Sequence, residues 1–187
     1  MGEGTFIIDK FPSIELIKQF PLIFDCEGEV GLNYIEGVLI LTLSKNGYVK
    51  LPTDFYSYVR NGAGQFVSHS HPAGPHSRYP SVDDIEFHMY GDKFYIITDQ
   101  GLLEVDITKL DKEKNIEKEL EESMNNSTTA YEDSESIYYY FYKSLNIEYK
   151  RYTDDDEIKD LINKRIGIKI DFWDKLAGTT PYPGKRR

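Results

Sequence analysis

The stretch Gln65–Glu86, QFVSHSHPAGPHSRYPSVDDIE, constrains the fold more than any other part of the chain. It predicts a short apolar strand that runs into His69 and His71, followed by a loop rich in Pro and Gly. Pro72 ends the strand, because proline lacks the N–H group that a β-ladder needs. Ser81 is a favourable N-cap residue, so a helix is expected to follow it, to about residue 90.

The same stretch predicts a metal site. Residues two apart in a strand point to the same face, so His69 and His71 can aim their imidazoles at one point. Neutral imidazole is the commonest protein ligand of zinc-like metals. Asp84 lies in the first turn of the predicted helix, near its positive end. One metal held by His69, His71 and Asp84, with a water in the fourth position, would have the open coordination of a catalytic zinc site.

Each half of this pattern has a simpler structural explanation. An H-x-H sequence alone is a weak signal, and S-x-x-D before apolar residues is a common helix-capping pattern. The two halves, joined by one short loop, together favour the metal site.

Composition and charge exclude several classes of protein. The chain has 187 residues, which suits one domain, and a net charge of −10. That charge argues against nucleic-acid binding and against an anionic membrane surface. A single cysteine excludes an intrachain disulfide, and we expect a cytoplasmic protein. No stretch reaches the roughly 18 apolar residues of a membrane span, and we expect no signal peptide.

A hydrolytic metal site also needs a base, and the candidates lie upstream at Glu27, Glu29 and Glu36. Glu36 is favoured because it immediately precedes Gly37 and the continuously apolar run 38–41, which predicts a strand buried on both faces. A carboxylate at the mouth of such a strand is partly desolvated, which raises its affinity for a proton. The acidic segment 25–31 predicts a turn. Ser81 could donate its hydroxyl to an oxyanion, cap the helix, or do both.

These residues resemble the pattern of the JAMM/MPN+ metalloprotease family: a Glu at the start of a strand, then H-x-H-P, a short loop and S-x-x-D. Here the pattern falls on Glu36, His69-Ser70-His71-Pro72 and Ser81–Asp84, and the resemblance covers roughly residues 14–107. It implies Zn²⁺ held by His69, His71 and Asp84, with Glu36 as the general acid/base and Ser81 as the oxyanion donor. It also implies an α/β (α+β) fold similar to cytidine deaminases, a mixed sheet flanked by helices.

The activity that the resemblance implies is zinc-dependent hydrolysis of peptide or isopeptide bonds in a protein substrate, for example at a ubiquitin-like C-terminus. The loop 72–80 is two residues longer than in the usual pattern. The chain is also similar to RadC-type proteins and to JAMM-like domains of bacterial polymorphic toxin systems, so the subfamily stays open. The alternative is a non-catalytic JAMM-fold binding or scaffold module. A barrel hydrolase that opens with H-x-H is excluded, because it needs about 250 residues and the motif in its first strand, and this chain offers neither.

We expect residues 1–176 to form a single JAMM-like domain, whose part from about residue 108 departs from the family. In that part, 110–124 predicts a mostly exposed helix and 137–145 an aromatic helix that packs on the core. The tail 177–187 is expected to be disordered. The oligomeric state is left open.

Two further histidines are candidates for a position around the metal ligands or at the substrate rim, but we expect His76 to be exposed and His88 to pack near the site. His76 is in the loop after Pro72. His88 follows Asp84 by four residues and would share its helix face.

Overall fold

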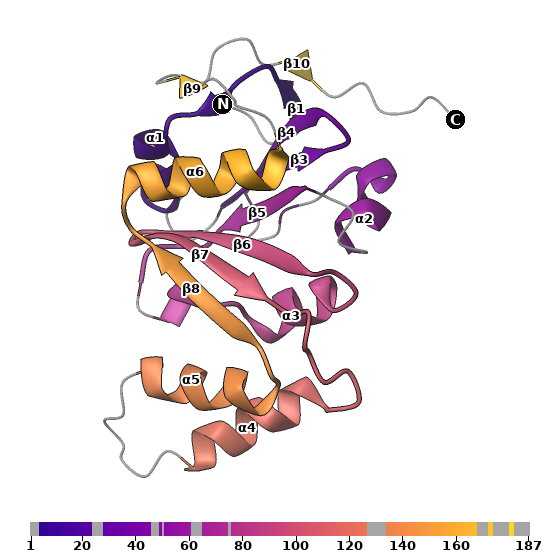
Figure 1. Ribbon diagram of the computed structural model, residues 1–187, viewed down its shortest axis with the longest axis vertical. Coiled ribbons are helices and arrows are strands. Elements are labelled where there is room, and N and C mark those ends of the chain that lie inside the picture. The colour runs from indigo at the N-terminus through magenta and orange to yellow at the C-terminus, as the bar shows by residue number, and fades with distance from the viewer. Residues whose placement is uncertain are drawn as a thin grey trace.

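A mixed sheet with helices on both faces forms the protein (Figure 1). The computed structural model describes residues 4–23, 28–45, 49, 51–60, 65–74, 76–126, 134–167, 172–173 and 180–181. Their eight-stranded sheet has the order β10-β1-β4-β3-β5-β6-β7-β8, in which only the pair β5–β6 is parallel. The predicted α/β class, with a mixed sheet flanked by helices, is therefore confirmed.

The strands of the large sheet are β1 (Gly4–Ile8), β3 (Glu29–Ile35), β4 (Val38–Ser44), β5 (Phe66–Ser70), β6 (Lys93–Thr98), β7 (Gly101–Asp106), β8 (Glu148–Tyr152) and β10 (Thr180–Pro181). A separate parallel pair joins β2 (Phe11–Pro12) to β9 (Phe172–Trp173). The helices are α1 (Ile14–Ile23), α2 (Thr53–Arg60), α3 (Val82–His88), α4 (Ile116–Asn126), α5 (Ser134–Ser144) and α6 (Asp155–Ile166), with a 3₁₀ turn η1 (His76–Arg78).

The alternation of residues along the strands separates two cores. On one face, residues such as Leu32 and Leu41 pack against α1 and α6. On the other face, Val67 packs with α2 and α3, while Phe94 and Leu103 pack with α3, α4 and α5. Figure 1 shows α1 and α6 together near the N-terminus, and α4 and α5 as a hairpin at the opposite end. The second face is the one that carries His69.

The turn between β3 and β4 corrects one sequence prediction. Residues 29–31, expected within a turn, instead begin β3, because they pair with β4 on one side and Gly31 also pairs with β5 on the other. The hairpin turn is at Glu36-Gly37, where both residues have positive φ (49° and 82°) between the paired Ile35 and Val38. Two successive positive φ angles are typical of a type I′ turn. Residues 24–27 lie outside the described residues.

The part of the chain from residue 108 on is continuous with the rest. β8 extends the large sheet beyond β7, and α6 contributes to the same core as α1. The predicted aromatic helix is α5, which buries Phe141 and Tyr142 and leaves Tyr139 and Tyr140 about half exposed. Within the predicted tail 177–187, residues 180–181 pair with β1 in place of a disordered segment, and the other tail residues lie outside the described ones.

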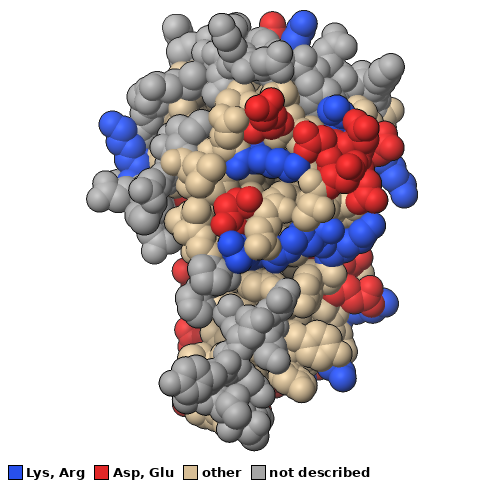
Figure 2. Space-filling model, turned by 90° about the vertical axis from the view of Figure 1, so that its left-hand side faces the viewer, with Lys and Arg blue, Asp and Glu red and all other residues tan. Residues whose placement is uncertain are grey.

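Charged residues of both signs share the surface. Figure 2 shows basic and acidic side chains lying next to one another on one face of the molecule. The ion pairs of the structure include Lys18–Asp155 and Arg78–Asp99. Among the described helices, none is both long and apolar enough to cross a membrane.

Two glycines with positive φ should differ in what they tolerate. A Cβ at Gly101 (φ 115°) would lie 2.2 Å from the backbone oxygen of Tyr152, whereas a Cβ at Gly167 (φ 77°) would meet nothing within 4 Å. We expect Gly101→Ala to lower the free energy of unfolding by more than about 2 kcal/mol, and Gly167→Ala by only about 1 kcal/mol. Urea unfolding measures both, and equal losses would contradict the close approach of β8 to β7.

Candidate metal centre

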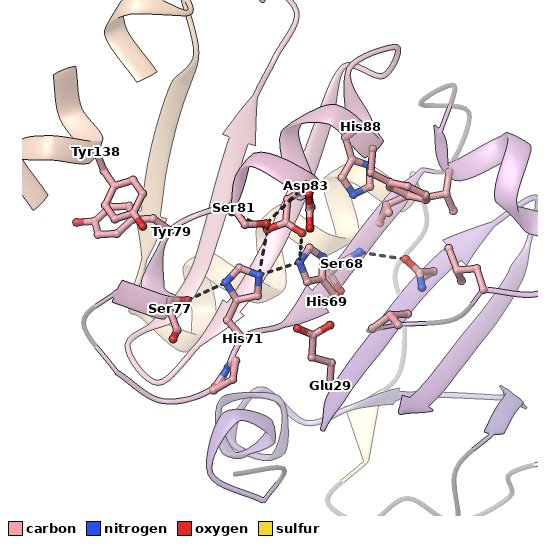
Figure 3. Close-up of a pocket in the computed structure, with 18 residues that line it drawn as sticks. Glu29, Ser68, His69, His71, Ser77, Tyr79, Ser81, Asp83, His88 and Tyr138 are labelled. Carbon is pink, nitrogen blue, oxygen red and sulfur yellow. Dashed lines mark hydrogen bonds and ion pairs between the residues drawn. The ribbon is translucent and has the colours of Figure 1, made fainter. Parts of the chain in front are cut away.

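Three predicted ligands meet at the end of β5. His69 Nε2 and His71 Nε2 are 3.0 Å apart, and Asp84 lies 3.0 Å from the first through Oδ1 and 3.2 Å from the second through Oδ2. Figure 3 shows the two imidazole rings facing each other between Glu29 and Ser81. All three ligand atoms lie within 4.8 Å of one another, so the residues could hold a metal ion.

Local structure positions each ligand. His71 continues the path of β5, because its N–H donates to the carbonyl of Ile97 at 3.0 Å. Asp84 is fixed by a capping box at the start of α3. Its backbone N–H donates to Ser81 Oγ at 3.1 Å, and its Oδ2 accepts from the backbone N–H and the hydroxyl of Ser81, both at 2.7 Å. The predicted helix start is therefore confirmed together with its cap.

The cluster is built to receive a positive charge. His71 Nδ1 lies 2.8 Å from the carbonyl oxygen of Ser77, so Nδ1 carries a hydrogen, and Nε2 is the ring nitrogen that faces His69 and Asp84. Burial opposes protonation of His69, but the negative charge of Asp84 prevails and raises the pKa of His69. Burial by itself would raise the pKa of Asp84, but the two histidines outweigh this effect and hold that pKa well below its usual range.

The spacing of the donor atoms also fits a metal ion. Tetrahedral sites with metal–ligand bonds of about 2.0–2.1 Å have ligand atoms roughly 3.3 Å apart. The 3.0 Å between the two Nε2 atoms and the 3.0 Å from His69 Nε2 to Asp84 Oδ1 are close to this value. Two imidazole nitrogens and a carboxylate oxygen form a donor set for several transition metals, so the geometry alone does not fix the element.

Glu29 is the carboxylate that the fold brings beside the ligands. Gly31 pairs with His69 across β3 and β5, and Glu29 lies two residues away on the same face of β3. Burial is the main cause that raises the pKa of Glu29, helped by the charge of Asp84. The two histidines and a hydrogen bond from the Val49 backbone partly lower it. A half-buried carboxylate of raised proton affinity next to metal ligands has the properties of a general base.

Glu36, the predicted base, is not brought to the cluster. It is exposed in the turn after β3 and does not line the pocket that contains the two histidines. The last residue of β3, Ile35, is 35 − 31 = 4 residues beyond Gly31, roughly 13 Å at about 3.3 Å per residue. The Glu36-Gly37 pair is the sequence signal that could have identified Glu29. If this pair is taken as a two-residue hairpin turn, the segment before it becomes a strand that starts at Glu29.

The other predicted site residues have different positions. Ser81 lines the pocket and caps α3. His88 also lines the pocket but is buried and stacked on Phe94, with ring centroids 4.3 Å apart. Its ring centroid is 6.4 Å from that of His69, and it does not belong to the three-residue cluster. The backbone of His76 is in η1, and its side chain lies outside what the structure describes.

The cluster opens into a pocket of about 460 Å³. Besides the residues already named, its walls include Asn33, Val49, Leu51, Val59, Val67, Ser68, Pro72, Tyr79, Asp83, Phe87 and Tyr138. This volume is in the range of small-molecule and substrate sites.

Metal binding tests the ligand assignment. We expect wild type to bind one Co²⁺ with visible absorption, and His69→Ala or Asp84→Asn to weaken binding at least about tenfold, because each removes one donor or its charge. Glu36→Gln is the matched control, since it changes a carboxylate outside the cluster. Equal affinities in all four proteins would place the metal elsewhere.

His88 should make stability depend on pH. Its pKa is lowered to about 3, mainly by burial and also by the nearby His69, while Asp84 and a hydrogen bond with the Val59 backbone act in the opposite direction. In the unfolded chain the pKa is about 6.5. The folded state thus favours neutral His88, and the stabilisation present above pH ~6.5 is lost as pH falls toward 3.

For the metal-free protein, we expect the free energy of unfolding to fall between pH 7 and 5 by about 2 kcal/mol more in wild type than in His88→Phe. Urea unfolding with a chelator present measures the difference. Parallel pH profiles would show that His88 is not held neutral.

The sequence as a whole does not identify relatives. No protein-family model matches the chain, and neither a curated protein nor a solved structure does. The family resemblance noted from the sequence therefore stays a prediction, and it rests on the residues around His69, His71 and Asp84.

Proposed function

We propose that the protein is a zinc-dependent peptidase or isopeptidase of the JAMM type. The observation that carries the proposal is the presence, in one pocket, of a His-His-Asp group that could hold a metal and of the Glu29 carboxylate. The proposal keeps the predicted ligands and moves the general base from Glu36 to Glu29. Glu29 is the first residue of β3, which agrees with the position of the Glu at a strand start in the family pattern.

Zinc is the metal that we propose for this donor set. Catalytic zinc sites have three protein ligands from His, Asp and Glu and one open position, and the three residues fit that description. A zinc ion held by His69, His71 and Asp84 would polarise a substrate carbonyl and make a water more acidic.

Glu29 takes the proton of the attacking water and returns it to the leaving amine. For this a carboxylate must be ionised at rest and still accept a proton readily. Burial raises its proton affinity, while the histidines and the N–H of Val49 keep the ionised form accessible. The effect of such a base is typically 10²–10⁴-fold in rate.

Ser81 is the candidate donor to the oxyanion. Its hydroxyl lies at the pocket wall, 2.7 Å from Asp84 Oδ2, to which it donates. To serve the oxyanion it must rotate away from Asp84, and the backbone N–H of Ser81 then remains as a donor to Oδ2 at 2.7 Å. The cap can therefore persist when the hydroxyl turns.

The substrate in this proposal is a protein or peptide, with a ubiquitin-like C-terminus as one form of it, in a cytoplasmic setting. The arrangement of strands and helices would be that of the cytidine-deaminase-like JAMM fold. The alternative, a binding module of the same fold, differs in lacking turnover and is separated by the experiment below.

The decisive experiment compares two conservative changes. Zinc-loaded wild type, Glu29→Gln and Glu36→Gln are assayed on a quenched-fluorescent peptide library and on a ubiquitin-like fusion protein. We expect Glu29→Gln to lower kcat by at least about 100-fold, because the base is lost, and to retain its zinc. Glu36→Gln should cleave like wild type, because Glu36 is exposed in a turn outside the pocket.

Three results would contradict the proposal. Absence of zinc from the purified wild type after loading would show that the site does not hold the proposed metal. Cleavage by Glu29→Gln at the wild-type rate would show that Glu29 is not the general base. Zinc binding without hydrolysis of any substrate would favour the binding module.

A further inference from the structure

One side of the pocket is a hydrocarbon wall that the metal chemistry does not use. It consists of Val49, Leu51, Val59, Val67 and Phe87, which we call the apolar wall. Val59 and Val67 are buried in a small core with Ile35 and Ile40, and Leu51 and Phe87 pack on that core while remaining partly exposed. The wall is thus firmly supported and still accessible from the pocket.

The apolar wall lies directly beside the metal ligands. Val67 precedes His69 by two residues and points to the same face of β5. Phe87 is on α3, one turn after Asp84, and Val59 comes from α2, which contacts α3. In Figure 3 the labelled Tyr79 and Tyr138 lie on the His71 side of the cluster, away from His88. These two tyrosines pack in a different hydrophobic core from Val59, Val67 and Phe87, so a ligand centred on the cluster contacts two distinct surfaces.

A buried polar group without a partner among the described residues lies beside the wall. Asn33 is buried opposite Val67, and its Oδ1 accepts a hydrogen bond from the backbone N–H of Ser68 at 3.1 Å. Among the residues that the structure describes, its Nδ2 has no hydrogen-bond partner, although it is buried and the residue lines the pocket. Nδ2 also lies close to Gly31, the residue that pairs with His69: it would be 3.3 Å from a Cβ at that position. A buried donor without a partner is costly, and an acceptor on a ligand would satisfy it.

We propose that the apolar wall is a specificity pocket for a bulky aliphatic or aromatic side chain of a peptide residue next to the scissile bond, and that Asn33 Nδ2 donates to a backbone carbonyl of that peptide. The five hydrocarbon side chains offer no partner to a polar or charged group, which would lose its hydrogen bonds there. The unpaired amide N–H can be satisfied by a carbonyl oxygen next to the apolar group. An amino-acid residue carries both a side chain and an adjacent backbone carbonyl. This inference deepens the proposed function and rests on it.

The test uses ligands that bind without turnover. Dissociation constants of N-acetyl-glycine, N-acetyl-leucine and N-acetyl-phenylalanine hydroxamates are measured on the zinc-loaded protein by calorimetry. The hydroxamate group anchors each ligand on the metal, and the three differ only in the side chain. We expect the leucine and phenylalanine compounds to bind at least tenfold more tightly than the glycine compound, because each buries an apolar side chain.

Three variants separate the parts of the proposal. Leu51→Trp fills the partly exposed rim of the apolar wall and should abolish the advantage of the larger side chains while leaving the glycine compound unchanged. Tyr138→Ala, on the other side of the cluster, is the matched control and should keep the advantage. Asn33→Asp retains the acceptor for Ser68 but removes the donor, so it should weaken all three compounds by a similar factor.

A metal-free measurement distinguishes failure of this inference from failure of the proposed function. N-acetyl-leucine methylamide should shift the methyl resonances of Val59 and Val67 in the metal-free protein, and N-acetyl-glycine methylamide should not. Those shifts would support the pocket even if no zinc binds and no peptide is cleaved. Equal affinities for the three hydroxamates, an advantage lost in Tyr138→Ala and kept in Leu51→Trp, or absent shifts at both valines would overturn it. An unchanged Asn33→Asp would overturn the role of the amide.

Discussion

The antiparallel pairing of β3 with β5, with Gly31 opposite His69, is the constraint on which the site depends. Side chains alternate along a strand with a period of two, so a slip of one residue would turn a strand's whole set of side chains to the other face. In the observed register Glu29 and the two histidines lie on the face that α2 and α3 cover. Pairing of β3 with β4 over seven residues holds this register from the other side.

The small size of Gly31 is required by the close approach of Val49 to β3. A Cβ there would lie 2.6 Å from Cγ1 of Val49, so the glycine lets Val49 approach the sheet. The backbone N–H of Val49 donates to the Glu29 carboxylate, and its side chain belongs to the apolar wall. One missing side chain thereby links the electrostatics of the proposed base to the shape of the proposed specificity pocket.

The difference between Glu29 and Glu36 shows which parts of a site the sequence can predict. His69, His71 and Asp84 were predictable, because the period of a strand and the geometry of a helix cap are local properties. The predicted class of sheet and helices was confirmed for the same reason. Which carboxylate lies beside the ligands depends on which strand pairs with β5 and in which register, and that is decided by distant residues. Glu36 was favoured for its place before an apolar run, but Glu36-Gly37 takes the positive φ angles of a hairpin turn, which directs the carboxylate to solvent.

The capping box of α3 limits how the site can work. Oδ2 of Asp84 already accepts two hydrogen bonds from Ser81, whereas Oδ1 accepts none from Ser81 and faces His69. Those two bonds reduce the charge that Oδ2 can offer to a metal, so Oδ1 is the better donor atom. Rotation of the Ser81 hydroxyl toward an oxyanion would leave one bond on Oδ2 and return negative charge to the carboxylate as charge develops on the substrate. In the proposed reaction, the same serine would thus couple the helix cap to the strength of the metal ligand.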